Sequence, residues 1–269
     1  MFKQRLISGI ILVVIAVITL YFGGMLTFLV TAGISLIGMY ELLRVIHVEK
    51  SALSVTAYTG AILYYILLLL SLDQYILPLL LLILIVMFSV YVFTFPKYEI
   101  SSVAITFFSI IYVTVTLSCI YRIRILEDGA YMVVLVFLSA WGNDTLAYCA
   151  GRLFGRHKMS PVLSPKKTIE GAVGGVIGAG LLGALYGLIA RHFITADFNL
   201  ILVFAIVCAV GGLISIVGDL GASAIKRNYE IKDYSNLIPG HGGILDRFDS
   251  IIFTAPIIYY LLVLVVGLQ

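Results

Sequence analysis

Acidic and basic side chains that could handle phosphates gather in the second half of this chain. The acidic ones are Asp144, Asp219, Asp246 and Asp249. The basic ones are Lys166, Lys167, Lys226, Arg227 and Arg247. Carboxylates can hold Mg²⁺, which prefers oxygen ligands and keeps positions for water or substrate phosphates. Lys and Arg bind phosphate directly. A site with both suits phosphoryl transfer, in which metal and basic groups neutralise the reacting phosphates.

These side chains come from three polar segments, residues 141–158, 164–171 and 217–250. In the first segment, Asn143 and Asp144 fall within or near the end of an apolar run. An aspartate inside a membrane span costs about 2.5–3.5 kcal/mol on insertion scales, so it is a functional candidate by default. The alternative is a polar pair at the interfacial end of a helix.

The second segment, SPKKTIEG, has the pattern of a helix start. Ser164 suits the N-cap and Pro165 the first helical position. Lys166 and Lys167 then lie at a helix N-terminus, whose free N–H groups attract anions, so the pattern suits a phosphate. Lysines that merely precede a span on its cytoplasmic side are the alternative. Glu170 is expected to pair with one of the lysines.

The glycine-rich run that follows, GAVGGVIGAG, carries small residues at four-residue steps. That spacing favours close helix–helix packing. A glycine loop for a nucleotide needs a strand–turn–helix context, which the sequence does not offer here. We therefore expect residues 171–180 to pack rather than to bind.

The third segment brings several polar groups onto one helical face. Ser223 and Lys226 follow Asp219 by four and seven residues, so the three share a face if the helix continues. Asp246 and Asp249, three residues apart at the head of the last apolar run, also share a face. We expect both faces to contribute to one site.

Between these faces lies PGHGG, residues 239–243, which cannot form a regular helix. Its glycines permit close approach of the backbone to a ligand. Irregular backbone near a membrane is tolerated where it lines a polar cavity. His241 has two interpretations, a hydrogen bond that stabilises the loop or contact with a substrate phosphate.

The composition is that of a membrane protein: 62% of residues are hydrophobic, 12% are charged and the mean hydropathy is +1.13. The apolar runs do not alternate as in a transmembrane barrel, so an all-α polytopic fold is expected. The nine predicted spans are 5–22, 26–46, 53–71, 76–95, 102–121, 130–150, 170–190, 199–221 and 250–268. We divide the chain into helices of a scaffold, 1–129, with possible dimer contacts, and a catalytic region, 130–269.

Basic residues predict the orientation of the spans. With the N-terminus inside, only Arg122, Arg124 and Arg191 fall outside, and the other 14 of the 17 Lys and Arg fall inside. The C-terminus is then outside and all three polar segments face the cytoplasm. Arg122 and Arg124 either snorkel to the outer interface or face an internal cavity. The three cysteines lie in spans and suggest neither a disulfide nor a thiolate metal site.

Residues 223–249, SAIKRNYEIKDYSNLIPGHGGILDRFD, resemble the signature of the phosphatidate cytidylyltransferases, also called CDP-diacylglycerol synthases. The upstream segments NDTLAYCAGRLFGRHK and SPKKTIEG are also similar to that family, so the resemblance covers most of 140–250. The matching signature positions are Ser223, Lys226, Arg227, Lys232, Asp233, Pro239, Gly240, His241, Gly242, Gly243, Asp246, Arg247 and Asp249.

The resemblance implies an enzyme of the cell membrane, a nucleotidyltransferase of phospholipid biosynthesis. CTP and phosphatidic acid would give CDP-diacylglycerol and pyrophosphate with Mg²⁺, at the cytoplasmic side. The expected partners are thus CTP, phosphatidic acid and the bilayer, without nucleic acid. The spans rich in small residues are also compatible with a homodimer.

Roles follow for the candidate residues. Asp219 and Asp246 are expected to hold Mg²⁺, with Asp144 and Asp249 as further ligands, and the surplus of carboxylates leaves room for a second cation. Lys167, Lys226 and Arg227, with Asp246, are the expected catalytic groups. The expected substrate-binding groups are Asn143, Lys166, Ser223, Gly240, His241, Gly242, Gly243 and Arg247.

Two other functions remain open at this point. A CTP-dependent lipid kinase would need a base for a lipid hydroxyl, and Asp246 or Asp249 could serve. An ion-coupled transporter could use Asp144 and Asp219 as relay groups. Transporters commonly show inverted repeats and sites at the membrane midplane, and the sequence shows neither.

Overall fold

The computed structural model describes residues 2–265 and 267, with side chains described from Ile7 to Leu264 and at Gly267. Its helical elements, in order, are α1 (Phe2–Phe22), α2 (Gly24–Val45), α3 (Ala52–Leu69), η1 (Asp73–Tyr75), α4 (Ile76–Phe93), α5 (Ile100–Ser109), η2 (Ile110–Val115), α6 (Thr116–Arg124), α7 (Gly129–Met132), α8 (Val134–Phe137), η3 (Leu138–Gly142), α9 (Asn143–Phe154), α10 (Ile169–Ala190), α11 (Leu200–Asn228) and α12 (Leu245–Val265). Two short strands, β1 (Lys158–Ser160) and β2 (Ser164–Thr168), form a hairpin between α9 and α10.

The helices confirm the expected all-α polytopic fold. Among the described residues, eight helical stretches are long and apolar enough to cross a membrane, and α1 adds a shorter apolar stretch, Ile7–Phe22. Two of the eight contain π-helical turns, η2 and η3. The predicted last span begins five residues earlier, at Leu245, and two of its predicted residues, 266 and 268, lie outside the described part of the chain.

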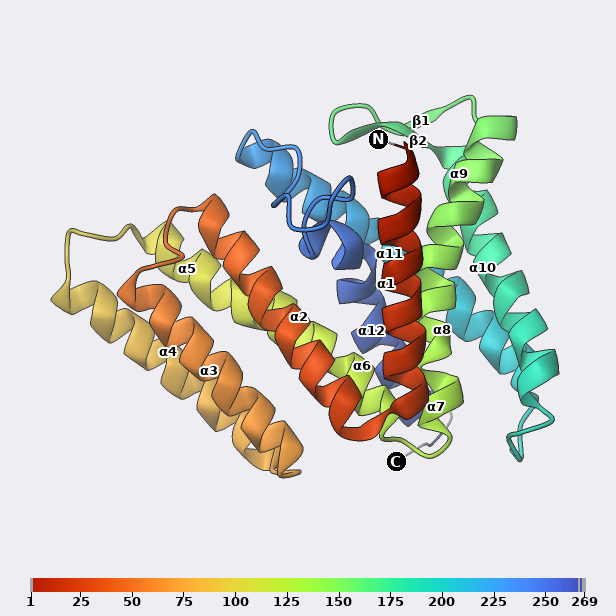
Figure 1. Ribbon diagram of the computed structural model, residues 1–269, viewed down its shortest axis with the longest axis horizontal. Coiled ribbons are helices and arrows are strands. Elements are labelled where there is room, and N and C mark those ends of the chain that lie inside the picture. The colour runs from red at the N-terminus through yellow and green to blue at the C-terminus, as the bar shows by residue number, and fades with distance from the viewer. Residues whose placement is uncertain (1, 266, 268–269) are drawn as a thin grey trace.

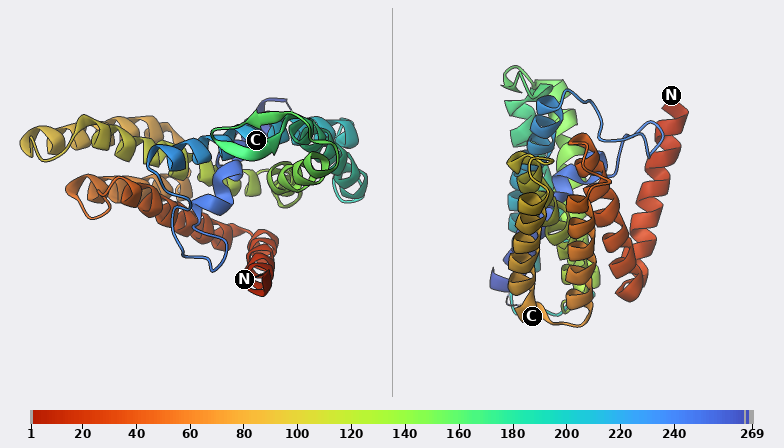
Figure 2. Two further views of the ribbon diagram at one scale, coloured as in Figure 1. Left: turned by 90° about the horizontal axis from the view of Figure 1, so that it is seen from above. Right: turned by 90° about the vertical axis from the view of Figure 1, so that its left-hand side faces the viewer.

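The bundle is elongated when seen from above, with α3 and α4 near one end and α9–α11 near the other (Figures 1 and 2). The hairpin and the 229–244 loop lie at the same end of the helices as the start of α1, which we call the hairpin end (Figure 1). The helix α12 ends at the opposite end. It packs against α11 and α6, and so joins the two halves of the chain in one core.

Close packing of the C-terminal helices depends on glycine, as the sequence predicts. A Cβ atom at Gly174 would lie 2.4 Å from Cβ of Ala150, and one at Gly178 would lie 2.5 Å from Cδ1 of Leu146. Both contacts bring α10 against α9 without intervening side chains. Since the small residues of α10 are used inside the chain, they do not themselves argue for the predicted homodimer, which stays a prediction.

The predicted helix start at Ser164 is wrong, because residues 164–168 form β2. Strand β2 pairs antiparallel with β1, and the helix begins only at Ile169. Thr168, not Ser164, is the N-cap: its Oγ1 accepts a hydrogen bond of 3.1 Å from the N–H of Gly171. A proline fits here because its lost N–H is harmless at a strand edge.

Glu170 also differs from expectation. It does not pair with a lysine but lies 2.6 Å from Nδ1 of His157 and accepts the backbone N–H groups of Arg156 and His157. The carboxylate thereby ties the start of α10 to the chain just after α9. This contact fixes where the hairpin emerges from the bundle.

Arg122 and Arg124, at the end of the bundle opposite the hairpin, both have polar partners within the chain. Arg122 forms an ion pair of 2.5 Å with Asp73, and Nε of Arg124 donates to the carbonyl oxygen of Leu20 at 2.9 Å. Both link α6 to neighbouring segments rather than to a site. The helix α1 stands at one side of the bundle, with the 229–244 loop reaching towards it (Figure 2, right).

Candidate active site

A polar cavity of about 490 Å³ opens among β2 and the helices α9, α10, α11 and α12. It brings together side chains that are up to 106 positions apart in the sequence. Nine of the predicted site residues line it: Asn143, Asp144, Lys166, Lys167, Asp219, Lys226, Asp246, Arg247 and Asp249. The three polar segments therefore do converge on one site.

Two ion pairs organise the charges in the polar cavity. Lys167 of β2 pairs with Asp219 of α11, and Nζ of Lys226 lies 2.7 Å from Oδ1 of Asp246. The hydroxyl of Ser223 is 3.5 Å from the other oxygen of Asp219, which confirms that these α11 residues share a face. Each ion pair joins two elements, so the lysines also hold the walls of the cavity together.

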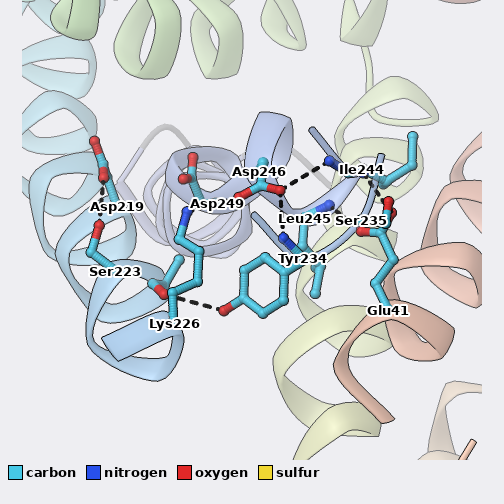
Figure 3. Close-up of polar contacts among 12 residues, drawn as sticks. Glu41, Asp219, Ser223, Lys226, Tyr234, Ser235, Ile244, Leu245, Asp246 and Asp249 are labelled. Atoms are coloured by element: carbon cyan, nitrogen blue, oxygen red, sulfur yellow. Dashed lines mark hydrogen bonds and ion pairs between the residues drawn. The ribbon is translucent and has the colours of Figure 1, made fainter. Parts of the chain in front are cut away.

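Asp246 is the most constrained of the four aspartates. Besides the Lys226 pair, its Oδ2 accepts the N–H groups of Tyr234 at 2.8 Å and Gly243 at 2.9 Å (Figure 3). The carboxylate is 1% exposed. Burial raises the pKa of Tyr234 far above its usual value, and its hydroxyl stays a donor, to the carbonyl of Ala222 at 3.2 Å. Asp246 therefore anchors the 229–244 loop as well as lining the cavity.

Asp144 and Asp249 are less engaged. Oδ2 of Asp144 accepts the Ser250 hydroxyl at 3.2 Å, and Oδ1 of Asp249 accepts the Ser250 N–H at 2.8 Å. Among the described residues neither forms an ion pair with Lys or Arg. Asp219 lies within electrostatic range of both. Three carboxylates around one cavity repel one another, and a bound cation would relieve that repulsion.

The carboxylates fit a magnesium ion that takes part of its coordination from substrate. Within the part of the chain that the structure describes, no three His, Cys, Asp or Glu side chains lie close enough to hold a metal by themselves. Mg²⁺ commonly binds one or two carboxylates, several waters and substrate phosphates, so it does not require such a cluster. Asp144 and Asp249 suit this role because neither is engaged in an ion pair within the described residues. The ligand set stays a prediction.

The buried amide of Asn143 joins helices. Its Nδ2 donates to Oγ of Ser215 at 2.9 Å, and a Cβ at Gly175 would lie 2.6 Å from its Oδ1. Asn143 is the first residue of α9, directly after the π-helical turn η3. Such turns are frequent at functional sites. Asn143 thus sets the packing beside Asp144, and its predicted contact with substrate stays untested.

A smaller basic recess of about 230 Å³ adjoins the polar cavity. Two residues, Lys166 and Lys226, line both. The recess adds Ser223, Arg227 and Lys232, and no acidic side chain lines it within the described residues. A volume lined by cations and a hydroxyl attracts phosphate groups.

An apolar cavity of about 480 Å³ lies on the other side of the aspartates, between α1, α2 and the head of α12. Its walls include Leu12, Ala16 and Val30. Four residues line both this cavity and the polar one: Asp144, Asp246, Arg247 and Asp249. Nε of Arg247 is buried without a hydrogen-bond partner in the described part of the chain, so a cationic donor remains available at this shared wall.

The glycine turn 239–243 lies towards α1 rather than on the polar cavity. Gly240 and Gly242 have φ of 77° and 84°, values that favour glycine. The hydroxyl of Ser8 donates to the carbonyl of Pro239 at 3.1 Å and lies 2.6 Å from Nδ1 of His241. His241 therefore lines the apolar cavity. That Gly240, Gly242 and Gly243 bind nucleotide phosphates stays a prediction.

Two residues beside the site, Ser250 and Glu41, were hard to identify from the sequence. Ser250 bridges Asp144 and the head of α12. Glu41 accepts three hydrogen bonds from residues of the 229–245 region. The available signal for Glu41 is an acid near the inner end of the apolar run 26–46, where the sequence favours a helix-end role over a part in a site.

Comparison with known proteins places these features in a family. A family model described as the cytidylyltransferase family matches residues 3–265. Proteins named phosphatidate cytidylyltransferase are similar in Staphylococcus saprophyticus, with 38% identity over 168 residues, 62% of each chain, and in Thermotoga maritima, with 37% over 167 residues, 61% of this chain and 60% of the relative. The relative in Bacillus subtilis is 39% identical over 147 residues, 54% and 53% of the two chains. The matches thus span about three fifths or less of these relatives.

Proposed function

The chain belongs to the cytidylyltransferase family, and on that premise we propose that it transfers a cytidylyl group from CTP to phosphatidic acid. The products are CDP-diacylglycerol and pyrophosphate. Support comes from the relatives that are named phosphatidate cytidylyltransferase and from the charges of the polar cavity. The same charges bear on how two polyanionic substrates are brought together.

The observation that carries the proposal is the shared wall of the two cavities. One substrate is a water-soluble nucleotide and the other a lipid, so their reacting phosphates must meet at a boundary between polar and apolar volumes. Asp144, Asp246, Arg247 and Asp249 form such a boundary. In the proposal, CTP occupies the polar cavity, and the acyl chains of phosphatidic acid lie in the apolar cavity beside α1.

The basic recess supports the placement of CTP. The terminal phosphates of CTP carry most of its charge. In the proposal these phosphates extend from the shared wall into the basic recess, which is lined by Lys166, Lys226 and Arg227. These contacts favour departure of pyrophosphate, because cations stabilise the charge that builds on the leaving group. Lys166 and Lys226 connect the recess to the polar cavity and keep the triphosphate in line.

The reaction requires little covalent chemistry from the protein. A phosphate oxygen of phosphatidic acid forms a bond to the α-phosphorus of CTP, and the bond from that phosphorus to the oxygen bridging the β-phosphate breaks. The nucleophile is already an anion, so no strong base is needed. The protein's task is to hold two polyanions in contact: Arg247 is placed to neutralise charge at the shared wall, and Lys226, held by Asp246, at the transferred phosphate.

Magnesium belongs to the proposal as well. When bound, it would supply electrostatic stabilisation of the reacting phosphates. We prefer Asp144 and Asp249 as holders because neither forms an ion pair with Lys or Arg in the described part of the chain, whereas Asp219 is paired with Lys167 and Asp246 with Lys226. A second cation could use Asp219 together with substrate oxygens.

The chain is a multi-pass membrane protein, and we place it in the cell membrane with the hairpin end at the cytoplasm. The excess of Lys and Arg at that end supports this orientation. CTP then enters the polar cavity from the cytoplasm, and the lipid enters from the inner leaflet.

The direct test is product analysis with purified protein, Mg²⁺, phosphatidic acid and CTP that is labelled at either the α- or the γ-phosphate. The proposal expects the α-label in a lipid product and the γ-label in pyrophosphate. A CTP-dependent lipid kinase, offered diacylglycerol, would place the γ-label in lipid and release CDP, which would overturn the proposal. Turnover in detergent, without a sealed membrane, would argue against a transporter.

A further inference from the structure

A carboxylate from the N-terminal half of the chain caps the helix that carries Asp246. Glu41 of α2 is 1% exposed. Its Oε1 accepts the N–H of Ile244 at 2.9 Å and its Oε2 the N–H of Leu245 at 2.8 Å (Figure 3). The first amides of a helix have no partner within the helix. Glu41 supplies those partners to α12 from 204 positions away in the sequence.

Glu41 and Asp246 join the same two segments of the 229–245 region. Oε1 of Glu41 also lies 2.5 Å from the hydroxyl of Ser235, which donates to it. Asp246 holds the adjacent amides, those of Tyr234 and Gly243. The segments 234–235 and 243–245 are therefore connected twice by buried carboxylates, so displacement of one carboxylate disturbs the backbone that orients the other.

The surroundings of Glu41 are built for a carboxylate. Every contact it makes in this region comes from an N–H or O–H donor, and the N-terminus of a helix favours negative charge. A Cβ at Gly243 would lie 2.5 Å from Oε1 of Glu41, so only glycine allows this approach. Glu41 lines neither the polar nor the apolar cavity. It lines a third cavity of about 1040 Å³, with Arg44 and Ser235, that shares only Asp233 with the polar cavity and no residue with the apolar one.

We propose that Glu41 is a positioning residue for the transfer reaction, a statement that rests on the proposed function. It fixes the Asp246–Lys226 pair in the polar cavity through the backbone of residues 243–246, without contacting CTP or lipid. The N-terminal half thereby contributes to the geometry of the site and not only to the scaffold.

The test compares Glu41→Gln with Glu99→Gln, the same chemical change at an exposed glutamate of the same half. A glutamine at position 41 turns one acceptor into a donor that faces an N–H or O–H group. We expect kcat to fall about tenfold or more, since small misplacements of reacting groups are costly. The KM for phosphatidic acid should stay within about twofold because the apolar walls formed by Leu12, Ala16 and Val30 make no described hydrogen bond to Glu41. Glu99→Gln should match the wild type.

Hydrogen exchange supplies a readout that does not depend on activity. In Glu41→Gln, we expect faster exchange at the amides of Tyr234, Gly243, Ile244 and Leu245, with α9 and α10 unchanged. Faster exchange throughout the chain would identify Glu41 as a general stabiliser and overturn the inference. Wild-type kcat in Glu41→Gln would overturn it too, as would lost activity with unchanged exchange in this region.

A second variant covers the case in which Glu41→Gln does not fold. Ser235→Ala removes one donor to Glu41 and keeps both backbone contacts. We expect about a two- to fivefold fall in kcat with faster exchange confined to the same segments. Wild-type values for both would contradict the inference. If the wild-type protein itself makes no CDP-lipid, the proposed function fails, while the exchange measurement still decides whether Glu41 positions Asp246.

Discussion

Asp246 and Asp249 lie three positions apart at the head of α12, yet their surroundings differ. Asp246 accepts two backbone N–H groups and pairs with Lys226. Asp249 accepts only the N–H of its neighbour Ser250 among the contacts described. A carboxylate whose two oxygens are both engaged maintains structure, and one that forms no ion pair among the described residues remains available to a cation.

Substitution by asparagine should separate the two roles. Asp246→Asn should both abolish most activity and lower the free energy of unfolding by about 3–5 kcal/mol, because it leaves Lys226 without its buried partner. Asp249→Asn should lose activity with little change in stability, within about 0.5 kcal/mol. Activity assays and thermal unfolding in detergent measure both. A stable, fully active Asp246→Asn variant would refute the account of this residue.

At the level of single residues, the sequence predicted the cavity well because its groups stand out chemically. Charged side chains beside apolar runs are few, and nine of the predicted residues line the polar cavity. The sequence did not reveal that Asp246 accepts backbone N–H groups, because those contacts depend on the path of the 229–244 loop. It also gave no reason to join Glu41 to Ile244, because no local pattern relates positions 203 residues apart.

The element between α9 and α10 shows where local sequence patterns mislead. Ser164 and Pro165 satisfy the rules for a helix start, but residues 164–168 pair instead with β1. Pairing between strands depends on a partner segment, which a helix-start pattern does not consider. The consequence is functional, because a strand carries Lys167 to Asp219 while Lys166 lines both the polar cavity and the basic recess.

The N-cap of α10 can be tested by comparing the two positions. Thr168→Val keeps the shape of the side chain but removes the oxygen that accepts the N–H of Gly171, and should cost about 1 kcal/mol of stability. Ser164→Ala, at the cap expected from the sequence, should change stability by less than about 0.5 kcal/mol. Unfolding in detergent measures both. A larger loss in Ser164→Ala would restore the helix start at residue 164.

At the scale of the whole molecule, the all-α fold and the order of its long apolar helices could be predicted because twenty-residue apolar runs admit few other structures. The arrangement of α1 could not. Its residues are apolar like those of the other helices, and nothing in their order shows that α1 forms one wall of a cavity reaching Asp144 and Asp249. That feature depends on packing between distant segments.

The orientation in the membrane has a direct test in cysteine labelling of cells. With the native cysteines replaced, Val162→Cys in the hairpin should react with an impermeant thiol reagent only after the membrane is opened. Thr195→Cys, between α10 and α11 at the opposite end, should react in intact cells. Both positions are exposed. The reverse pattern would invert the topology that the basic residues predict.

In the proposed enzyme, two cavities, one for each substrate, meet at the shared wall. Ala16→Trp fills the apolar cavity beside α1, and Met159→Trp fills the polar cavity beside the hairpin. Steady-state kinetics should show the KM for phosphatidic acid raised about fivefold or more in Ala16→Trp, with the KM for CTP unchanged. Met159→Trp should show the opposite. If Ala16→Trp raises the KM for CTP and leaves that for phosphatidic acid unchanged, the account is contradicted.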